Sequence, residues 1–269
     1  DQPLVIQYSK WAWHILTLDF GTSIFHKAKI TEVVGQRLVN TVLLALGTIL
    51  FTWAIALPIG IYSAVRQYTL GDYFFTFLGF IGMSIPSFLL ALILLYWSGK
   101  YFGINVTGLF SPEYAVQSEW TGGKIIDLLQ HIWVPIVVLG ITGTAGMIRV
   151  MRGNLLDELK KPYVTTGKAK GLRPFKLMMK YPVRLAINPF ISSIGAIFPQ
   201  LISGGAIVAM VLSLPTVGPL LLDALMIEDI YLAGSMLMVL SLLGILGTLV
   251  SDLLLMWLDP RIRMEGGIR

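Results

Sequence analysis

The sequence predicts an all-α polytopic membrane protein, and three observations support that fold class. Of its 269 residues, 55% are hydrophobic and only 13% are charged, whereas a soluble domain carries about 25% charged residues. The apolar residues fall in long runs without Asp, Glu, Lys or Arg, most of them near the roughly 20 residues that a spanning helix needs. The basic residues gather between these runs. The composition therefore fits several helices in a lipid bilayer.

Residues 1–37 contain no run long enough to span a membrane. They do carry four large aromatic residues, Trp11, Trp13, Phe20 and Phe25. Aromatic residues of this kind concentrate at the membrane–water interface. We expect an external segment that rests on the membrane surface, with an ordinary extramembrane loop as the alternative.

Five spans are expected in the transmembrane region, 38–269. Pro86 interrupts the second, and Pro189 and Pro199 predict a kink or break in the fourth, because irregular backbone survives in lipid only where neighbours satisfy it. The long connection 98–130 has room for short helices or strands. The expected spans are residues 38–65, 73–97, 132–148, 185–214 and 231–258.

The distribution of Lys and Arg predicts the orientation. If residues 149–184 are cytoplasmic, that side holds 14 of the 20 basic residues and the other side holds six. Cytoplasmic loops are enriched in Lys and Arg, so we expect the N-terminus outside and the C-terminus inside. The net charge of +5 then reflects topology rather than nucleic-acid binding. Five spans with an external N-terminus also suggest a sixth helix, missing before Asp1.

The sequence offers no constellation typical of an enzyme. It has no Cys and only three His, which are far apart. It lacks a GxxxxGK[ST] phosphate loop, an HExxH zinc site and a GxSxG nucleophile elbow. We therefore expect no catalytic residue, no metal site and no cofactor in this chain.

Few polar side chains fall within the expected spans. Asp252 is the clearest ionisable one, and we expect it to pair with a neighbouring helix or to reach toward the cytoplasmic face. Hydrogen bonding between helices is the favoured role of the uncharged ones, and lining a hydrophilic translocation path is the alternative. These residues are Asn40, Asn188, Gln200, Ser203 and Ser213, of which Asn188, Gln200 and Ser203 are the candidates for a path.

Residues 149–184 hold ten basic and two acidic residues and are too polar for lipid. A solvated loop is the simpler interpretation, but the capping residues predict consecutive short helices, as expected of a docking element. The expected helices are one from Asn154 to Leu159, which Pro162 ends, one capped by Thr165 or Thr166 and ended by Gly171, and one with Pro174 in its first turn.

Three motifs carry a resemblance to a known family. Residues 163–172 read YVTTGKAKGL and residues 184–189 read RLAINP. They resemble the EAA loop of ABC importer permeases, in the YVxTAxAKGL version of the dipeptide/oligopeptide/nickel permease family, and its B-type subunit in particular. Residues 16–23, ending DFGTS, resemble that family's GDxGxS segment, and LDPRIR at 258–263 resembles its LDPRxR ending. The sequence departs from the family at Gly167, commonly Ala, and at 181–184, where a His-containing stretch is common.

The resemblance implies a type I ABC importer transmembrane domain, with residues 149–184 as its cytoplasmic coupling loop. In this family the loop forms helices that dock on the ATPase subunits. The residues implied in that contact are Tyr163, Val164, Thr165, Gly167, Lys168, Ala169, Gly171 and Leu172.

The resemblance also implies the partners. They are a second homologous permease subunit, two ATPase subunits that bind ATP and Mg²⁺, and an extracytoplasmic solute-binding protein, all at the cytoplasmic inner membrane of a bacterium or archaeon. The implied function is ATP-driven import of peptides or similar small solutes, oligosaccharides, opines and nickel chelates included. An ion-coupled secondary transporter is the alternative, but such carriers commonly show internal repeats and intramembrane ionisable residues, and neither is clear here.

Overall fold

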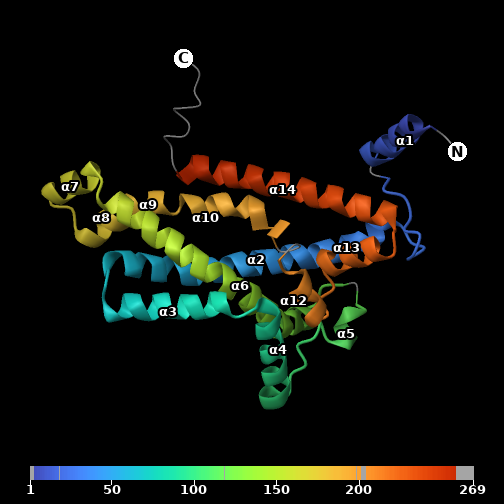
Figure 1. The fold of residues 1–269 in the computed structure, drawn as a ribbon, viewed down its shortest axis with the longest axis horizontal. Coiled ribbons are helices and arrows are strands. Elements are labelled where there is room, and N and C mark those ends of the chain that lie inside the picture. Colours follow the sequence, from blue (N-terminus) through green and yellow to red (C-terminus); the bar gives the residue numbers. More distant parts are fainter. Residues whose placement is uncertain (1–2, 18, 118, 198, 201–203, 259–269) are drawn as a thin grey trace.

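The computed structural model describes residues 3–17, 19–117, 119–197, 199–200 and 204–258. Within these ranges the chain is predominantly helical, and the β-type pairing consists of one isolated bridge between Thr22 and Lys29. Three helices are long and apolar enough to cross a bilayer, namely α2 (Ile30–Val65), α6 (Gly122–Leu159) and α14 (Ile230–Leu258). In Figure 1, α2 and α14 run along the long axis of the molecule and α6 runs obliquely to them. The predicted all-α membrane fold is confirmed.

Shorter helices make up most of the remaining described chain. In chain order they are α1 (Leu4–Leu16), α3 (Leu70–Ser84), α4 (Ser87–Trp97) with a π-helical turn (Ser98–Phe102), α5 (Pro112–Ala115), α7 (Pro162–Ala169), α8 (Pro174–Lys180), α9 (Pro182–Ala186), α10 (Asn188–Ser192), a 3₁₀ turn (Ser193–Ala196), α12 (Ala206–Val211) and α13 (Val217–Met226).

The helix α6 differs from its predicted course. The expected span 132–148 and the expected short helix 154–159 are one continuous helix, which begins where the Thr121 hydroxyl accepts a hydrogen bond from the Lys124 N–H at 3.3 Å. Asn154 lies inside this helix, so its predicted role as a cap is wrong. The reason is tertiary packing: Met151 and Leu155 are fully buried, and such packing outweighs a local capping preference. The basic segment is thus joined rigidly to a membrane helix.

The helix α2 also starts before its charge-free run. It begins at Ile30 rather than at residue 38, with Glu32 in its first turn. Charged residues such as Glu32 and Arg37 oppose entry into lipid but are compatible with helical backbone. Hydropathy therefore predicted the apolar part of this helix and not its full length.

The expected second span, 73–97, consists of two helices. α3 and α4 meet with a bend of 96°, and Figure 1 shows α4 leaving the end of α3 nearly at a right angle. Pro86 has no N–H to donate to the carbonyl of Gly82, so the helix cannot continue through it.

The expected fourth span, 185–214, is broken, as its prolines predict. Over the described part of this region, α9, α10, a 3₁₀ turn and α12 stand in place of one helix. Ser251 of α14 donates a hydrogen bond from its hydroxyl to the Ile191 carbonyl at 2.9 Å. A Cβ added at Gly195 would lie 2.6 Å from the Thr248 hydroxyl oxygen, so only glycine permits this close approach to α14. A neighbouring helix thus supports the broken backbone.

Three buried clusters hold the helices together. One joins α2, α13 and α14 around Met236, a second joins α4, α6 and α12 around Val138, and a third joins α2, α6, α9 and α10 around Phe190. By contrast, α3 and α14 expose large apolar side chains, including Phe77 at 62% and Trp257 at 75%. Exposed apolar faces of this extent suit contact with lipid or with another subunit.

Asn40 and Ser213, two of the polar residues noted in the expected spans, lie where helices meet connecting segments. The Asn40 side-chain amide donates a hydrogen bond to the Pro215 carbonyl at 2.9 Å, so it joins α2 to the segment before α13. This is the interhelical role favoured from sequence. Ser213 has a φ of 52° in the turn that follows α12.

Candidate functional site

The helix α7 starts and stops at defined signals. Pro162 occupies its first position after an extended Lys161, which suits proline because the first N–H of a helix has no partner. Thr165 and Thr166 therefore lie inside the helix, and the prediction that they cap it is wrong.

Gly171 ends α7 as predicted. Its φ is 72°, its N–H bonds the Lys168 carbonyl at 3.0 Å, and the Leu172 N–H bonds the Gly167 carbonyl at 3.2 Å. These two bonds are the Schellman pattern, which needs a left-handed residue, most readily glycine, just past the helix.

Gly167 lets α7 pack closely on α8. A Cβ at this position would lie 2.5 Å from the Leu177 Cδ1 atom. Val164 is 2% exposed and Leu177 is 3% exposed, so the two short helices share a small core. This accounts physically for glycine at a place where the resembled family commonly has alanine.

The structure divides the eight residues implied in ATPase contact into three groups by burial. Val164 and Gly167 are buried within this chain, so they support α7 from beneath. Tyr163 and Leu172 are half-buried. The outward-facing residues are Thr165, Lys168, Ala169 and Gly171.

The helix α8 adds exposed residues that sequence reasoning did not single out. Phe175 is 72% exposed and Met179 is 42% exposed, and both lie among the basic side chains of Lys176 and Lys180. Large apolar side chains exposed on a polar segment mark contact sites. The sequence signal that could have identified Phe175 and Met179 is that they are large apolar residues within a segment too polar for lipid. We call the exposed residues Thr165, Lys168, Ala169, Gly171, Phe175 and Met179 the α7–α8 surface.

Hydrogen bonds tie this surface to the membrane helices. The Tyr163 hydroxyl donates to the carboxylate of Glu158, at the end of α6. The Arg184 guanidinium donates to the Leu258 carbonyl at 2.7 Å and to the Trp257 carbonyl at 3.4 Å, which satisfies the end of α14 with a cation at the negative end of the helix dipole. Tyr163 thus links α7 to α6, and Arg184 links α9 to α14.

A cavity of about 430 Å³ lies between α2, α6 and the broken fourth segment. Gln200, a predicted path residue, lines it together with Thr48, Thr52, Ser87 and Thr142. A mostly apolar cavity with a few polar groups is the kind of lining found in ligand-binding pockets.

The other two predicted path residues differ from Gln200. Asn188 begins α10 and is half-buried, and its side-chain oxygen is buried without a hydrogen-bond partner among the described residues. Ser203 lies outside the described residues, as does the LDPRIR ending after Leu258.

Asp252 lies on a second groove, of about 790 Å³, along α14. Its side chain is exposed, and within the described part of the chain we find no hydrogen bond or ion pair for it, so the expected pairing with a neighbouring helix is not observed. Over the same described ranges, no three His, Asp or Glu side chains come together as metal ligands would.

The opposite end of the molecule is held by a buried carboxylate. Asp229 is 2% exposed and accepts hydrogen bonds from the Ser23 hydroxyl at 2.6 Å and the Leu232 N–H at 3.1 Å. Burial alone would raise the pKa of Asp229, but these hydrogen bonds outweigh it and hold the pKa below its ordinary value of 3.8. Ser23 belongs to the DFGTS motif, so this motif anchors the loop before α2 to the start of α14.

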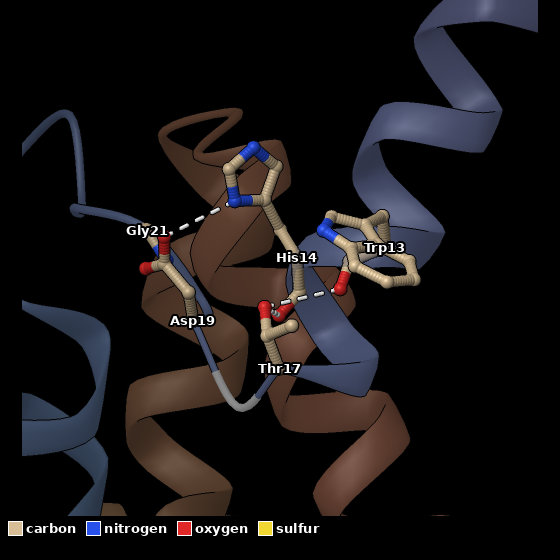
Figure 2. Close-up of polar contacts among 5 residues, drawn as sticks. All are labelled: Trp13, His14, Thr17, Asp19 and Gly21. Carbon is tan, nitrogen blue, oxygen red and sulfur yellow. Dashed lines mark hydrogen bonds and ion pairs between the residues drawn. The ribbon is translucent and has the colours of Figure 1, made fainter.

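The end of α1 leads into that loop through an exposed polar turn. Figure 2 shows the His14 ring directed at the Asp19 carboxylate, 3.1 Å away, and the Thr17 hydroxyl turned back to the carbonyls of α1. Hydrogen bonds from the Gly21 N–H and from His14 lower the pKa of Asp19. A cavity of about 530 Å³ opens here between α1 and α14, with Lys10 among its lining residues.

Comparison with known proteins gives one consistent result. The oligopeptide transport system permease protein AppB of Bacillus subtilis is 34% identical, over 97% of this chain and 81% of its own length. The dipeptide transport system permease protein DppB of Escherichia coli K12 is 28% identical, over 98% of this chain and 82% of its own length.

The fold agrees. The MetNI methionine ABC transporter, solved in inward-facing conformations, contains a chain that superposes with a TM-score of 0.63 at 16% identity, covering 85% of this chain and 97% of that one. Residues 56–264 match the family described as the binding-protein-dependent transport system inner membrane component. The match takes in the broken fourth segment, the α7–α8 surface and α14, and this chain belongs to that family of inner-membrane transport permeases.

Proposed function

We propose that this chain is the permease subunit of an ATP-driven importer of peptides, and that the α7–α8 surface couples it to ATPase subunits. The observation that carries the proposal is the unbroken course of α6, which runs from the membrane region directly into that surface. The peptide relatives support the substrate class. The proposed substrates are peptides or similar small solutes, oligosaccharides included.

Two ATPase subunits bind ATP and Mg²⁺, and their closure moves the coupling helices. Because α7 is bonded to α6 and α9 to α14, that movement changes the packing of the long helices between inward-open and outward-open states. ATP binding supplies the differential free energy that shifts this equilibrium. This chain contributes no catalytic group and no cofactor of its own.

The orientation follows from the basic residues. The α7–α8 surface and the C-terminus face the cytoplasm, and α1, α5 and the Asp229 anchor face outward. A solute-binding protein delivers substrate at the outward end. A second, homologous permease covers the exposed apolar faces, and the translocation path lies between the two.

The test is a matched pair of substitutions in the assembled transporter, reconstituted with its binding protein and ATPase subunits. Ala169→Trp places a bulky side chain on the α7–α8 surface, and Ala115→Trp, on the exposed helix α5 at the other end, controls for the effect of an added tryptophan on membrane insertion. We expect Ala169→Trp to lower peptide uptake at least tenfold while both variants insert normally, because steric exclusion at a packed contact exceeds 1.4 kcal/mol. Normal uptake by Ala169→Trp would refute the coupling role.

Energy source separates the importer from an ion-coupled carrier. Uptake by the importer persists when the proton gradient is collapsed and ATP remains, and it stops when ATP is depleted. The reverse pattern would establish a secondary transporter instead.

A further inference from the structure

Two arginines one turn apart on α6 line a cavity of about 240 Å³ between α3 and α6. Arg152 forms an ion pair with Asp72 of α3, with a nitrogen–oxygen distance of 3.0 Å. Arg149 is exposed, and its guanidinium contacts the Met83 sulfur at 3.6 Å and lies 5.6 Å from the centre of the Phe80 ring. Among the described residues no carboxylate pairs with Arg149, and the described lining of the cavity includes no acidic residue. The cavity therefore carries one uncompensated positive charge.

Arg152 is also incompletely satisfied by the fold. The Asp72 carboxylate bonds one nitrogen of its guanidinium group, and the Arg152 side chain remains 31% exposed. Its Nε atom is buried and has no hydrogen-bond partner in the described structure. Most buried polar atoms in proteins are paired, so an unpaired one calls for a physical reason. An anion in this cavity would lie beside two guanidinium groups, whose planar forks match the oxygens of a phosphate.

The position of Arg149 along α6 places the cavity near a membrane surface. Residues 128–148 contain no Asp, Glu, Lys or Arg, and at 1.5 Å per residue this run is about 30 Å long, the thickness of the hydrocarbon core. Arg149 is the first charged residue after the run. From there α6 continues to Leu159 and the α7–α8 surface, at the end that we assign to the cytoplasm. The Arg149 guanidinium thus lies at the depth where lipid phosphates begin.

On the side of α3, the surroundings of the cavity are apolar. Phe75, Gly79, Phe80 and Met83 line it, and Phe77 and Phe80 are more than half exposed. An exposed aromatic face of this kind suits contact with acyl chains. An arginine against lipid tails is costly unless it reaches the headgroups or pairs with an anion. A phosphate that carries acyl chains meets both the charge and the apolar surroundings, whereas a free anion meets only the charge.

We propose that the cavity between α3 and α6 binds the phosphate group of an anionic phospholipid in the cytoplasmic leaflet, with Arg149 as its main ligand. Basic pockets between transmembrane helices on this side of a membrane suit acidic lipid headgroups. Of the exposed apolar faces, the one on α3 beside Arg149 is then in contact with lipid. The site concerns the membrane around the transporter, so it does not depend on which solute is carried.

The test is lipid binding to the complete transporter, purified with its partner subunits in a mild detergent and freed of native lipid. Phosphatidylglycerol is titrated at about 0.15 M salt, which screens general attraction to surface charges, and bound lipids are counted by native mass spectrometry. Phosphatidylcholine, which has a phosphate but no net charge, and inorganic phosphate are the comparison ligands. Arg149→Gln removes the charge from the cavity. Arg66→Gln, at an exposed arginine just past α2 and outside the cavity lining, is the matched control.

We expect Arg149→Gln to raise the dissociation constant of the most tightly bound phosphatidylglycerol about tenfold or more, the usual effect of losing a charge-assisted hydrogen bond. Arg149→Lys should retain part of the affinity, because lysine keeps the charge and loses the planar fork. Arg66→Gln should bind the lipid as the unsubstituted protein does.

A second variant changes the space in the cavity and leaves its charge unchanged. A Cβ at Gly79 would lie 3.5 Å from the Ala145 Cβ atom, which is an ordinary contact. Gly79→Leu should therefore extend a side chain into the cavity that Gly79 lines and lower the affinity for phosphatidylglycerol. Thermal unfolding of each variant checks that the fold is intact.

Five results would overturn the inference. Equal losses of affinity in Arg149→Gln and Arg66→Gln would show general attraction to the protein surface. Equal affinity for phosphatidylcholine would show that the site does not select an anionic lipid. Displacement of the lipid by inorganic phosphate would assign the cavity to a soluble anion. Loss of the second permease from Arg149→Gln complexes would make the cavity a contact between subunits. Unchanged binding in Arg149→Gln would show that this arginine binds no lipid.

Discussion

The two ends of this molecule hold their loops in different ways. At the end containing α1 and α13, a buried carboxylate, Asp229, collects hydrogen bonds from Ser23 and from backbone N–H groups of two segments. At the α7–α8 end, local turn geometry dominates, with a left-handed Gly171 and a close approach at Gly167. The first end is held by contacts between segments far apart in the sequence, whereas the second is built mainly from adjacent residues, with Arg184 as its long-range link to α14.

The difference suits two kinds of work. Long-range polar anchors brace the ends of helices, because breaking them exposes buried groups. Locally built helices can move as a unit while leaving their outer residues free for a partner. We therefore expect substitutions at the first end to lower the stability of the fold, and substitutions at the second end to affect coupling to the partner.

The largest effect is expected for Asp229→Ala. Removing the acceptor leaves the Ser23 hydroxyl and two backbone N–H groups unsatisfied in a buried site, which costs about 2–4 kcal/mol. Thermal unfolding of the purified protein in detergent should show a clear loss of stability. Asp19→Ala, at the exposed carboxylate of Figure 2, is the control and should change stability little. Similar losses of stability in Asp229→Ala and Asp19→Ala would show that the buried carboxylate stabilises the fold no more than an exposed one.

The same anchor predicts a pH dependence. The folded pKa of Asp229 lies below its ordinary value of 3.8, so its contribution to stability is present above that pH and is lost as the pH falls through the folded pKa. Stability should drop as the pH is lowered below this value. Asp229→Asn should flatten the drop in that window, and an unchanged profile would contradict the assignment.

At the other end, Gly171→Val should act locally. A β-branched residue at a φ of 72° costs about 1–2 kcal/mol, which distorts the turn between α7 and α8. We expect ATP-driven uptake to fall while the helical content and membrane insertion persist. Gly171→Asn, which tolerates the left-handed region, should retain most uptake. Global unfolding by Gly171→Val would show that this end also stabilises the whole fold.

The smallest effect is expected for Arg184→Gln. It removes the cation that caps α14 through the Leu258 carbonyl, worth about 1 kcal/mol or less for a largely exposed group. A small decrease in thermal stability should be measurable, and Lys176→Gln, an exposed lysine on α8, is the matched control. If both variants were equally stable, the hydrogen bond between Arg184 of α9 and the end of α14 would contribute nothing measurable to the stability of the fold.

Sequence reasoning succeeded where a signal was local. Gly171 ends α7 and Pro174 begins α8 because the left-handed turn and the proline ring restrict the backbone at those positions. It failed at Asn154. Asparagine is a preferred N-cap residue, but burial of Met151 keeps α6 helical through this position. It also missed Phe175, whose exposure depends on which face of α8 packs on α7.

By itself the sequence determined the class of the protein, the positions of its apolar runs and the family motifs, since each depends on composition or on short-range order. Only the tertiary structure decided that Asp229 is an anchor, that α3 and α4 meet at 96° and that Arg152 of α6 pairs with Asp72 of α3. These features join residues far apart in the chain. Their energies depend on distance and burial in three dimensions, which no local pattern records.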